Sequence, residues 1–359
     1  MDFEFTAEQE MLRASVRAFL AAAAPLAIVR ATYDAPAGDP AVWAGLRELD
    51  VTGLLVGEAN GGAGHGMVDA AVVLEELGRA VSPAPYASSA IGAVALADAE
   101  LLPALADGSL VGTVAIFEPE TRYAWERPST RATRAGNGWQ LDGEKAHVFD
   151  ANAADVVLVT ATDDADALGV FACDAFEAEP TDTVDGSRKQ GRIRFSGAGA
   201  RRVDVQGDVR AAVAGALDRL GVAVAVDAVG AAQRALELTL EYAKEREQFG
   251  KPIGAFQAVQ HLCADMLRTV ELGRAAAYYA CWAIDDASAE EAHRASTIAR
   301  AFAADAFPSL GASAIQVFGG IGFTWEHDIH LYFKRLLSSA YLLGTASEHL
   351  EELASIAID

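Results

Sequence analysis

Basic residues are scarce in this sequence. Its 359 residues include 28 Lys and Arg but 51 Asp and Glu, which gives a formal net charge of -23 at pH 7. Proteins that bind nucleic acids hold the phosphate backbone mainly through clustered Lys and Arg, and no basic stripe runs along this sequence. The composition therefore argues against a nucleic-acid partner.

Cysteines and long apolar runs are scarce as well. Cys173, Cys263 and Cys281 are too few and too widely spaced for a disulfide framework or a zinc site, so we expect no metal and a reducing compartment. The apolar run 19–29 is too short and too alanine-rich to span a bilayer, and the N-terminus is acidic where a signal peptide is basic. These features predict a cytoplasmic protein that does not enter a membrane.

Apolar residues, in contrast, are abundant. They make up 52% of the sequence, which is enough to bury a large core and to form two or three domains. The residue pattern is helical at first, then consists of short strand-like runs, and ends in long alanine-rich helical segments. We predict an N-terminal all-helical domain (1–110), a middle β domain (111–206) that is a barrel or a sandwich, and a C-terminal helical bundle (207–359).

Capping and spacing signals predict individual elements. Apolar residues recur at helical spacing between residues 6 and 24, and Thr6 with Gln9 forms a capping-box pattern at the start. In the middle segment, apolar runs such as 156–159 are separated by turn signals that include Gly136-Asn-Gly. Long helices are then predicted at 209–245, 255–285, 288–318 and 328–356.

The break between the first two long helices is unusually polar. Gly250 and Pro252 end the first helix, because glycine frees the backbone and proline removes a hydrogen-bond donor. A turn needs no more than these two residues, yet the same stretch also holds Arg246, Gln248, Phe249, Gln257 and Gln260. This surplus of polar groups predicts a binding site rather than a purely structural corner.

Two longer motifs carry a resemblance to a known family. They are Tyr242-x-x-x-Arg246-x-Gln248-Phe249-Gly250-x-Pro252-Ile253-x-x-Phe256-Gln257-x-x-Gln260 and Gln316-Val-Phe-Gly319-Gly320-Ile-Gly322-Phe-Thr324-x-Glu326. Weaker support comes from Glu75-Glu-Leu-Gly-Arg79 and Trp139-x-Leu-Asp-Gly143-x-Lys145. The sequence thereby resembles the acyl-CoA dehydrogenase family over nearly its whole length. The resemblance implies an α+β fold with an N-terminal helical domain, a middle β-barrel and a C-terminal four-helix bundle.

The resemblance also implies a cofactor and a reaction. Members of this family use FAD to oxidise an acyl-CoA thioester to the 2,3-enoyl-CoA, and they pass electrons to an electron-transfer flavoprotein or a similar acceptor. In the family's tetramers each FAD crosses a subunit boundary, and the neighbouring subunit holds the pyrophosphate and adenosine end. The residues that match this neighbour side are all present here, namely Arg246, Gln248, Phe249, Gln257, Gln316, Gly319 and Gly320.

The side that holds the flavin ring departs from the family pattern. The usual Thr-Glu-Pro stretch reads Phe117-Glu118-Pro119, and the usual Trp-Ile-Thr/Ser-Asn stretch reads His147-Val148-Phe149-Asp150, so a hydroxyl donor has become phenylalanine. Thr345 remains at a flavin-contacting position, whereas Ser347 stands where glutamine is common. The resemblance thus implies a complete site on one side of the cofactor only.

The catalytic base of the family is missing too. Its two known positions fall on Leu343 and Leu220, and leucine cannot accept a proton. An arginine that orders the substrate pocket in many members aligns with Gly221. Asp218 and Asp227 on the same predicted helix are left as candidates for a displaced base.

These departures lead to three hypotheses. In the first, the chain is the non-catalytic, β-type subunit of a heteromeric α2β2 acyl-CoA dehydrogenase and lends its FAD half-site to a catalytic partner; related two-gene enzymes often act on steroid-derived acyl-CoA. In the second, the chain forms a self-sufficient homotetramer with a displaced base. In the third, it is a scaffold subunit without flavin.

Overall fold

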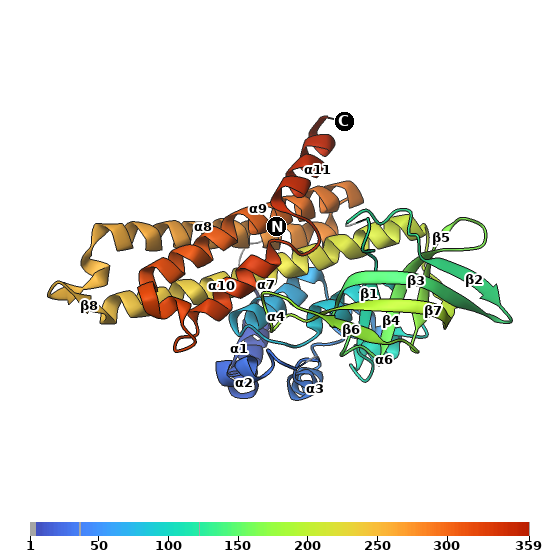
Figure 1. Cartoon of the computed structure of the whole chain (residues 1–359), viewed down its shortest axis with the longest axis horizontal. Helices are drawn as coiled ribbons and strands as arrows, with labels where there is room; N and C mark the ends of the chain where they lie inside the picture. Colours follow the sequence, from blue (N-terminus) through green and yellow to red (C-terminus); the bar gives the residue numbers. More distant parts are fainter. Residues whose placement is uncertain (1–4, 36, 122, 359) are drawn as a thin grey trace. The chain divides into compact units, whose positions relative to one another are not determined.

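The computed structural model describes residues 5–35, 37–121 and 123–358 (Figure 1). Two compact units make up the chain. One unit comprises Met1–Val29, Ala71–Ser82 and Gly221–Asp359, and the other comprises Arg30–Ala70 and Pro83–Leu220. The division of the sequence at residues 110 and 206 stays a prediction.

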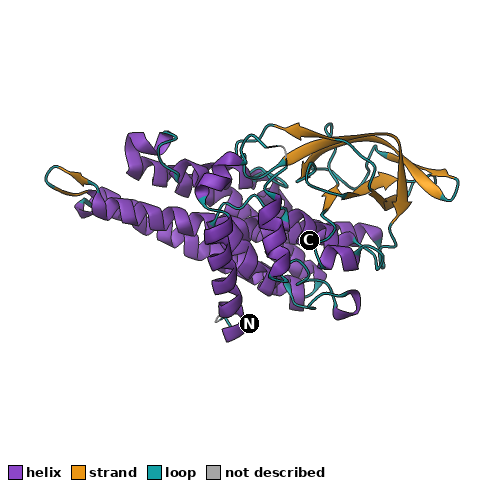
Figure 2. Cartoon of the chain, turned by 90° about the horizontal axis from the view of Figure 1, so that it is seen from below, coloured by secondary structure: helices purple, strands orange, loops and turns teal. Residues whose placement is uncertain are grey.

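Helices form both ends of the described chain, and strands occupy its middle (Figure 2). Before the strands come α1 (Ala7–Ala23), α2 (Leu26–Ala31), α3 (Pro40–Glu48), η1 (Glu58–Asn60), α4 (Met67–Arg79), η2 (Ala87–Ala93), α5 (Val94–Leu96) and α6 (Leu102–Ala106). After them come α7 (Val209–Glu245), η3 (Ile253–Ala255), α8 (Gln257–Asp286), α9 (Ala289–Phe318), η4 (Gly319–Phe323), α10 (Ile329–Ser339) and α11 (Ala346–Ile358). A short hairpin of β8 (Glu247–Gln248) and β9 (Lys251–Pro252) separates α7 from α8.

Helix α1 begins at the capping box that the sequence predicts. The backbone N–H of Gln9 donates to Thr6 Oγ1 at 3.2 Å, and the backbone N–H of Thr6 donates to Gln9 Oε1 at 3.0 Å. Two backbone donors that a helix start leaves unpaired are thereby satisfied. The prediction of a helix from about residue 6 to 24 is confirmed.

The middle strands close into a barrel. They are β1 (Gly112–Ala115), β2 (Arg131–Ala135), β3 (Gly138–Phe149), β4 (Val156–Thr162), β5 (Leu168–Cys173), β6 (Ala178–Thr181) and β7 (Gln190–Arg202). The pairing order β4-β2-β3-β7-β5 returns to its start because β5 also pairs with β4, while β1 and β6 join from outside this ring. The sequence predicted either a barrel or a sandwich. The pairing of β5 with β4 closes the sheet and shows that it is a barrel.

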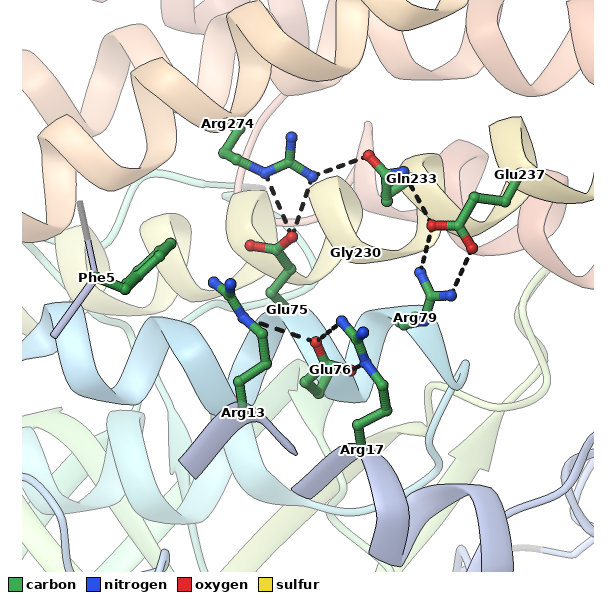
Figure 3. Close-up of a pocket in the computed structure, with 10 residues that line it drawn as sticks. All are labelled: Phe5, Arg13, Arg17, Glu75, Glu76, Arg79, Gly230, Gln233, Glu237 and Arg274. Carbon is green, nitrogen blue, oxygen red and sulfur yellow. Dashed lines mark hydrogen bonds and ion pairs between the residues drawn. The ribbon is translucent and has the colours of Figure 1, made fainter. Parts of the chain in front are cut away.

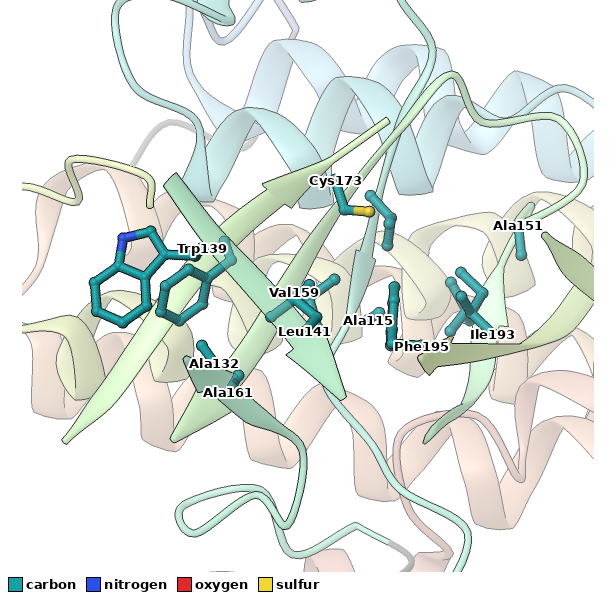
Figure 4. Close-up of a cluster of buried hydrophobic side chains, with 13 residues drawn as sticks. Ala115, Ala132, Trp139, Leu141, Ala151, Val159, Ala161, Cys173, Ile193 and Phe195 are labelled. Atoms are coloured by element: carbon teal, nitrogen blue, oxygen red, sulfur yellow. The ribbon is translucent and has the colours of Figure 1, made fainter. Parts of the chain in front are cut away.

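Inward-facing apolar side chains fill the barrel (Figure 4). Trp139 and Phe171 meet edge to face with ring centroids 5.2 Å apart, and Leu141, Val159 and Ile193 are fully shielded from solvent. In the long strand β7 buried and exposed residues alternate between Gly191 and Ser196, because successive side chains point to opposite faces of a strand.

Helices α4 and α7 cross in very close contact at two glycines. A Cβ atom added to Gly78 would lie 1.8 Å from the carbonyl oxygen of Asp227, and one added to Gly230 would lie 1.9 Å from that of Glu75. No side chain fits either gap, so the glycine of the Glu75–Arg79 motif has a packing role. This crossing places Glu75 and Arg79 directly against α7.

The C-terminal helices follow the predicted boundaries closely, with one correction. The single helix predicted at 328–356 is wrong, because the structure divides it into α10 and α11. Between them, Leu343 and Gly344 adopt φ angles of 63° and 130°, which an α-helix cannot contain. Thr345 then starts α11: its backbone N–H donates to Glu348 Oε2 at 2.8 Å, and the Glu348 N–H lies 3.4 Å from Thr345 Oγ1. The pattern Thr345-x-x-Glu348 was the sequence signal for this boundary.

One described segment, Ala289–Phe323, is long and apolar enough to be a candidate membrane span by length and composition. Within its unit α9 packs against α8, α10 and α11. A core helix of a bundle meets the same criterion, so the segment carries no conclusion about a membrane.

Candidate cofactor-binding site

The polar break between α7 and α8 is a tight hairpin. The backbone N–H of Ile253 donates to the carbonyl oxygen of Arg246 at 2.8 Å and so closes the pair of strands. Phe249 and Gly250 form the turn with φ angles of 54° and 77°. Positive φ at both turn residues matches a type I′ turn, whose twist suits paired strands. Helix α7 ends at Glu245, and Gly250 and Pro252 lie in the hairpin that follows it.

Phe249 is an unusual residue for this turn. A left-handed backbone suits glycine or asparagine, and a bulky aromatic residue there stores about 1–3 kcal/mol of strain. Phe249 is 93% exposed, and its ring meets that of Phe256 edge to face, with the centroids 6.1 Å apart. An exposed aromatic side chain held in a strained backbone is typical of a residue that contacts another molecule.

The structure brings the two sequence motifs together. The ring of Tyr242, one helical turn before Arg246, stacks on Phe318 with centroids 4.3 Å apart and planes 21° from parallel. Phe318 directly precedes Gly319 and Gly320, so the end of α7 and the end of α9 lie side by side. Residues from Arg246 and from the glycine pair can therefore act on one ligand.

Side chains at this junction have unused donors. Arg246 is exposed, and within the described residues its guanidinium makes no hydrogen bond or ion pair. The exposed amides of Gln257 and Gln316 likewise have no partner in that part of the chain, whereas Gln248 donates to the carbonyl oxygen of Glu247 at 2.8 Å. A guanidinium with five free N–H groups suits a phosphate-bearing anion.

The glycine pair leaves its backbone open to a ligand. Gly319 has φ 65° and ψ -142°, a conformation that other residues rarely adopt. Apart from chain neighbours, no atom of the described residues lies within 4 Å of the Cβ positions of Gly319 and Gly320. A bound anion could therefore approach the peptide groups closely. We call the surface formed by Arg246, Gln257, Gln316, Gly319 and Gly320 the anion corner.

Thr345, the remaining predicted contact, is used in the fold. Its hydroxyl donates to Glu348 Oε2 at 2.7 Å and caps α11. A flavin contact by Thr345 stays a prediction.

Glu118, in the stretch 117–119 that is predicted to lie on the flavin-ring side, forms a buried ion pair with Lys145 in the barrel. Lys145 Nζ lies 2.9 Å from Glu118 Oε1, and it also donates to the carbonyl oxygen of Ile116 at 3.1 Å and to Thr160 Oγ1 at 3.2 Å. Glu118 accepts four further hydrogen bonds from the backbone and hydroxyl groups of Ser129 and Thr130. Both oxygens of the Glu118 carboxylate therefore accept hydrogen bonds from groups of the barrel.

Burial and pairing shift the pKa of both partners. Burial by itself raises the pKa of Glu118, but Lys145 and the hydrogen bonds from Ser129 and Thr130 outweigh it and lower the pKa to about 2. Burial lowers the pKa of Lys145 to about 8, against the attraction of Glu118. Sequence reasoning matched Lys145 to a motif but missed the pair. Glu118 follows β1 and Lys145 lies within β3, so the two residues are 27 positions apart and meet only in the folded barrel.

The second altered stretch offers no hydroxyl either. Phe149 is buried, and its carbonyl oxygen accepts a hydrogen bond from Thr113 Oγ1 at 2.6 Å. His147 and Asp150 on either side have φ angles of 55° and 51°, and Ser88 Oγ donates to Asp150 Oδ2 at 2.6 Å. Through these contacts, residues 147–150 pack within the unit that contains the barrel.

The predicted base positions lack any acid or base. Leu220 is buried and packs against Gly92, where an added Cβ would lie 3.0 Å from Leu220 Cδ2. Leu343 occupies the left-handed turn before Gly344. The chemistry of leucine rules out proton transfer at both positions, while their equivalence to the family's base positions stays a prediction.

Of the displaced candidates, Asp227 is firmly bound. Arg335 Nε and Nη2 donate to its two carboxylate oxygens at 2.9 and 2.8 Å, and both side chains are buried. Arg335 also donates to the carbonyl oxygen of Ser82 at 3.2 Å. This bidentate pair stabilises the ionised carboxylate and weighs against a role as a base. Asp218 is buried as well.

Comparisons with known proteins agree with this architecture. The family models described as "Acyl-CoA dehydrogenase, N-terminal domain" and "Acyl-CoA dehydrogenase, C-terminal domain" match residues 6–107 and 210–357. The chain belongs to the acyl-CoA dehydrogenase family, and the fold class predicted from the sequence is confirmed.

Individual relatives cover the whole chain. The acyl-CoA dehydrogenase IpdE2 of Mycolicibacterium smegmatis is 35% identical over 351 residues, which are 96% of this chain and 97% of that protein. Among solved structures, a chain of the Tcur3481–Tcur3483 steroid ACAD is 32% identical, with a TM-score of 0.88 and coverage of 98% for both chains. A chain of the ChsE4–ChsE5 complex from Mycobacterium tuberculosis is 26% identical, with a TM-score of 0.89 and coverage of 100% and 99%.

Proposed function

We propose that this chain is the non-catalytic subunit of a heteromeric acyl-CoA dehydrogenase. It supplies the anion corner to a FAD whose flavin ring lies on a partner subunit, and the partner supplies the catalytic carboxylate. The α2β2 assembly is part of the proposal.

One observation carries it, the contrast between the two halves of the predicted site. The anion corner keeps free donors and an open backbone, whereas the positions for the ring and the base hold a saturated ion pair, a buried phenylalanine and two leucines. A self-sufficient enzyme needs both halves, because proton removal from the acyl-CoA requires a base.

The residues of the anion corner fit the pyrophosphate of FAD. Arg246 would neutralise its charge, and the peptide groups of Gly319 and Gly320 would lie within reach of its oxygen atoms. Bound FAD supplies the acceptor for the hydride that leaves Cβ of the acyl group. This chain's contribution is to hold and orient that cofactor.

Partners and substrate follow from relatives and remain part of the proposal. Two of the similar structures are named as pairs of proteins, and one of these is named a steroid ACAD. We propose a steroid-derived acyl-CoA as the substrate, an electron-transfer flavoprotein or a similar protein as the electron acceptor, and the cytoplasm as the location.

Co-expression with a dehydrogenase-like partner tests the proposal. We expect the complex to hold one FAD for each pair of chains and to oxidise acyl-CoA, and we expect the isolated chain to hold little FAD. The substitution Arg246→Ala should lower the FAD content of the complex, whereas Arg268→Ala, which removes an exposed arginine that pairs with Asp265, should leave it unchanged. Full flavin loading and turnover by the isolated chain would refute the subunit role.

The alternatives predict different results in the same assay. A self-sufficient homotetramer is active without a partner and needs a carboxylate such as Asp218 or Asp227. A scaffold without flavin leaves the FAD content of the complex insensitive to Arg246→Ala.

A further inference from the structure

A cavity of about 260 Å³ lies within the unit that contains α1, α4, α7 and α8 (Figure 3). Its wall carries four arginines, Arg13 and Arg17 from α1, Arg79 from α4 and Arg274 from α8, against three glutamates. Two glutamates just outside the wall also pair with these arginines, Glu10 with Arg13 at 3.1 Å and Glu271 with Arg274 at 2.6 Å, so the cavity is rich in arginine without a net positive charge. This arginine cavity is separate from the anion corner, with which it shares no residue.

The three glutamates of the arginine cavity already accept hydrogen bonds from protein groups, so they have little capacity to accept more. Glu75 accepts from Arg274 and from the Tyr278 hydroxyl, the latter at 2.8 Å. Glu76 accepts from Arg17 Nε and Nη2 at 2.8 and 2.6 Å. Glu237 accepts two hydrogen bonds from Arg79, one from Gln233 and one from Arg234.

Arg13, in contrast, has donors to spare. Its side chain is only 18% exposed, and its guanidinium lies 4.1 Å above the ring of Phe5. Of its five N–H groups, the described residues accept a hydrogen bond from one, which runs outward to Glu10 at 3.1 Å. The distance from Arg13 Nε to Glu76 Oε1 is 4.0 Å, too long for a hydrogen bond.

The largely buried Arg13 guanidinium has lost hydrogen bonds to water. This loss costs free energy unless other acceptors replace the water, so its unused N–H groups favour a bound acceptor. Carboxylate and phosphate oxygens match the planar fork of a guanidinium and can accept hydrogen bonds from its unused N–H groups. Figure 3 shows the head groups of Arg13 and Arg17 on the same side of the cavity, on either side of Glu76.

We propose that the arginine cavity is a binding site for a small carboxylate- or phosphate-bearing anion, with Arg13 as its principal ligand. The site is independent of the proposed FAD function. Arg13 donates to the anion oxygens, and the Arg17–Glu76 pair holds the wall in place.

Titration calorimetry on the full chain tests this site. Inorganic phosphate and malonate serve as separate probes at about 0.15 M salt, where long-range repulsion by the acidic surface is screened. We expect saturable binding of at least one probe and weakening by about tenfold or more in Arg13→Gln. Binding of phosphate only, or of malonate only, identifies the class of head group.

Two further variants separate this site from its competitors. Arg13→Lys keeps the charge but loses the fork, so it should bind more weakly than the wild type and more tightly than Arg13→Gln. Arg246→Ala should bind the probe normally and Arg13→Gln should leave the FAD content of the complex unchanged. Loss of binding in Arg246→Ala but not in Arg13→Gln would assign the anion to the anion corner and overturn the proposal. Absence of saturable binding by either probe would overturn it as well.

Discussion

At the scale of single residues, Lys145 and Glu118 show how a motif residue can serve structure. Lys145 is fully buried and bound to one carboxylate, one carbonyl and one hydroxyl. Replacing it with methionine leaves the buried Glu118 charge without its counter-ion, so we expect Lys145→Met to lower the free energy of unfolding by about 3–5 kcal/mol. Urea denaturation of the full chain measures the change.

An exposed lysine provides the control for that experiment. Lys244, at the end of α7, is exposed, and Lys244→Met should change the free energy of unfolding by less than about 0.5 kcal/mol. If Lys145→Met changed the free energy of unfolding as little as Lys244→Met, the Lys145–Glu118 pair would contribute little to the stability of the barrel.

Asp227 gives a second test at this scale. Asparagine cannot neutralise the buried Arg335, so Asp227→Asn should destabilise the chain by about 3–5 kcal/mol. Because we assign Asp227 a structural role, turnover by the complex per folded protein should stay within about threefold of wild type. We would measure urea denaturation and steady-state kinetics on the same preparation.

The two measurements distinguish structure from catalysis. A stable variant whose kcat falls by about a hundredfold or more would make Asp227 the displaced base, since loss of a general base typically costs about 10²–10⁴ in rate. Such a result would favour the self-sufficient enzyme over the subunit.

At the scale of elements, the crossing of α4 and α7 depends on glycine. The methyl group in Gly78→Ala would lie 1.8 Å from a backbone oxygen of α7, and backbone cannot move aside as a flexible side chain can. We expect a loss of stability of at least about 1–3 kcal/mol, the usual effect of overpacking. Thermal or urea unfolding would measure it.

Gly215 in α7 is a matched control. The nearest atom to its Cβ position is the end of the Arg219 side chain at 3.2 Å, which can move. Gly215→Ala should therefore be neutral or should stabilise the helix by up to about 1 kcal/mol. Equal effects of the two substitutions would contradict the packing role of Gly78.

At the scale of the whole molecule, acid sensitivity follows from paired carboxylates. Burial by itself raises the pKa of Glu237, but hydrogen bonds and charge from Arg79, with help from Gln233 and Arg234, lower it from 4.5 to about 2. A lowered pKa in the folded state adds stability above about pH 4.5, and this stability is lost as the pH falls toward 2.

The variant Glu237→Gln isolates that contribution. The difference in free energy of unfolding between wild type and Glu237→Gln should be constant above about pH 4.5 and should shrink as the pH falls toward about 2. Urea denaturation at several pH values measures the difference, and high salt screens the net charge in both proteins. For the exposed Glu290→Gln we expect a small difference at every pH; an equally flat profile for Glu237→Gln would contradict the assignment.

The sequence predicted much of the fold because its signals are local. Helix α1 was readable from Thr6 and Gln9, and the predicted end of α7 at Glu245 agrees with the structure, because caps, breakers and 3.6-residue periodicity act over a few neighbours. The same kind of signal, Thr345-x-x-Glu348, was present before α11 but stood inside an otherwise helical pattern.

What the sequence determined by itself is the family, the order of helical and strand segments, and the absence of a proton acceptor at Leu220 and Leu343. Tertiary structure alone decided the closure of the barrel, the junction of Tyr242 with Phe318, and the arginine cavity. The physical reason is distance along the chain: Arg13, Glu76 and Arg274 come from α1, α4 and α8, and only the packing of these helices places them around one cavity.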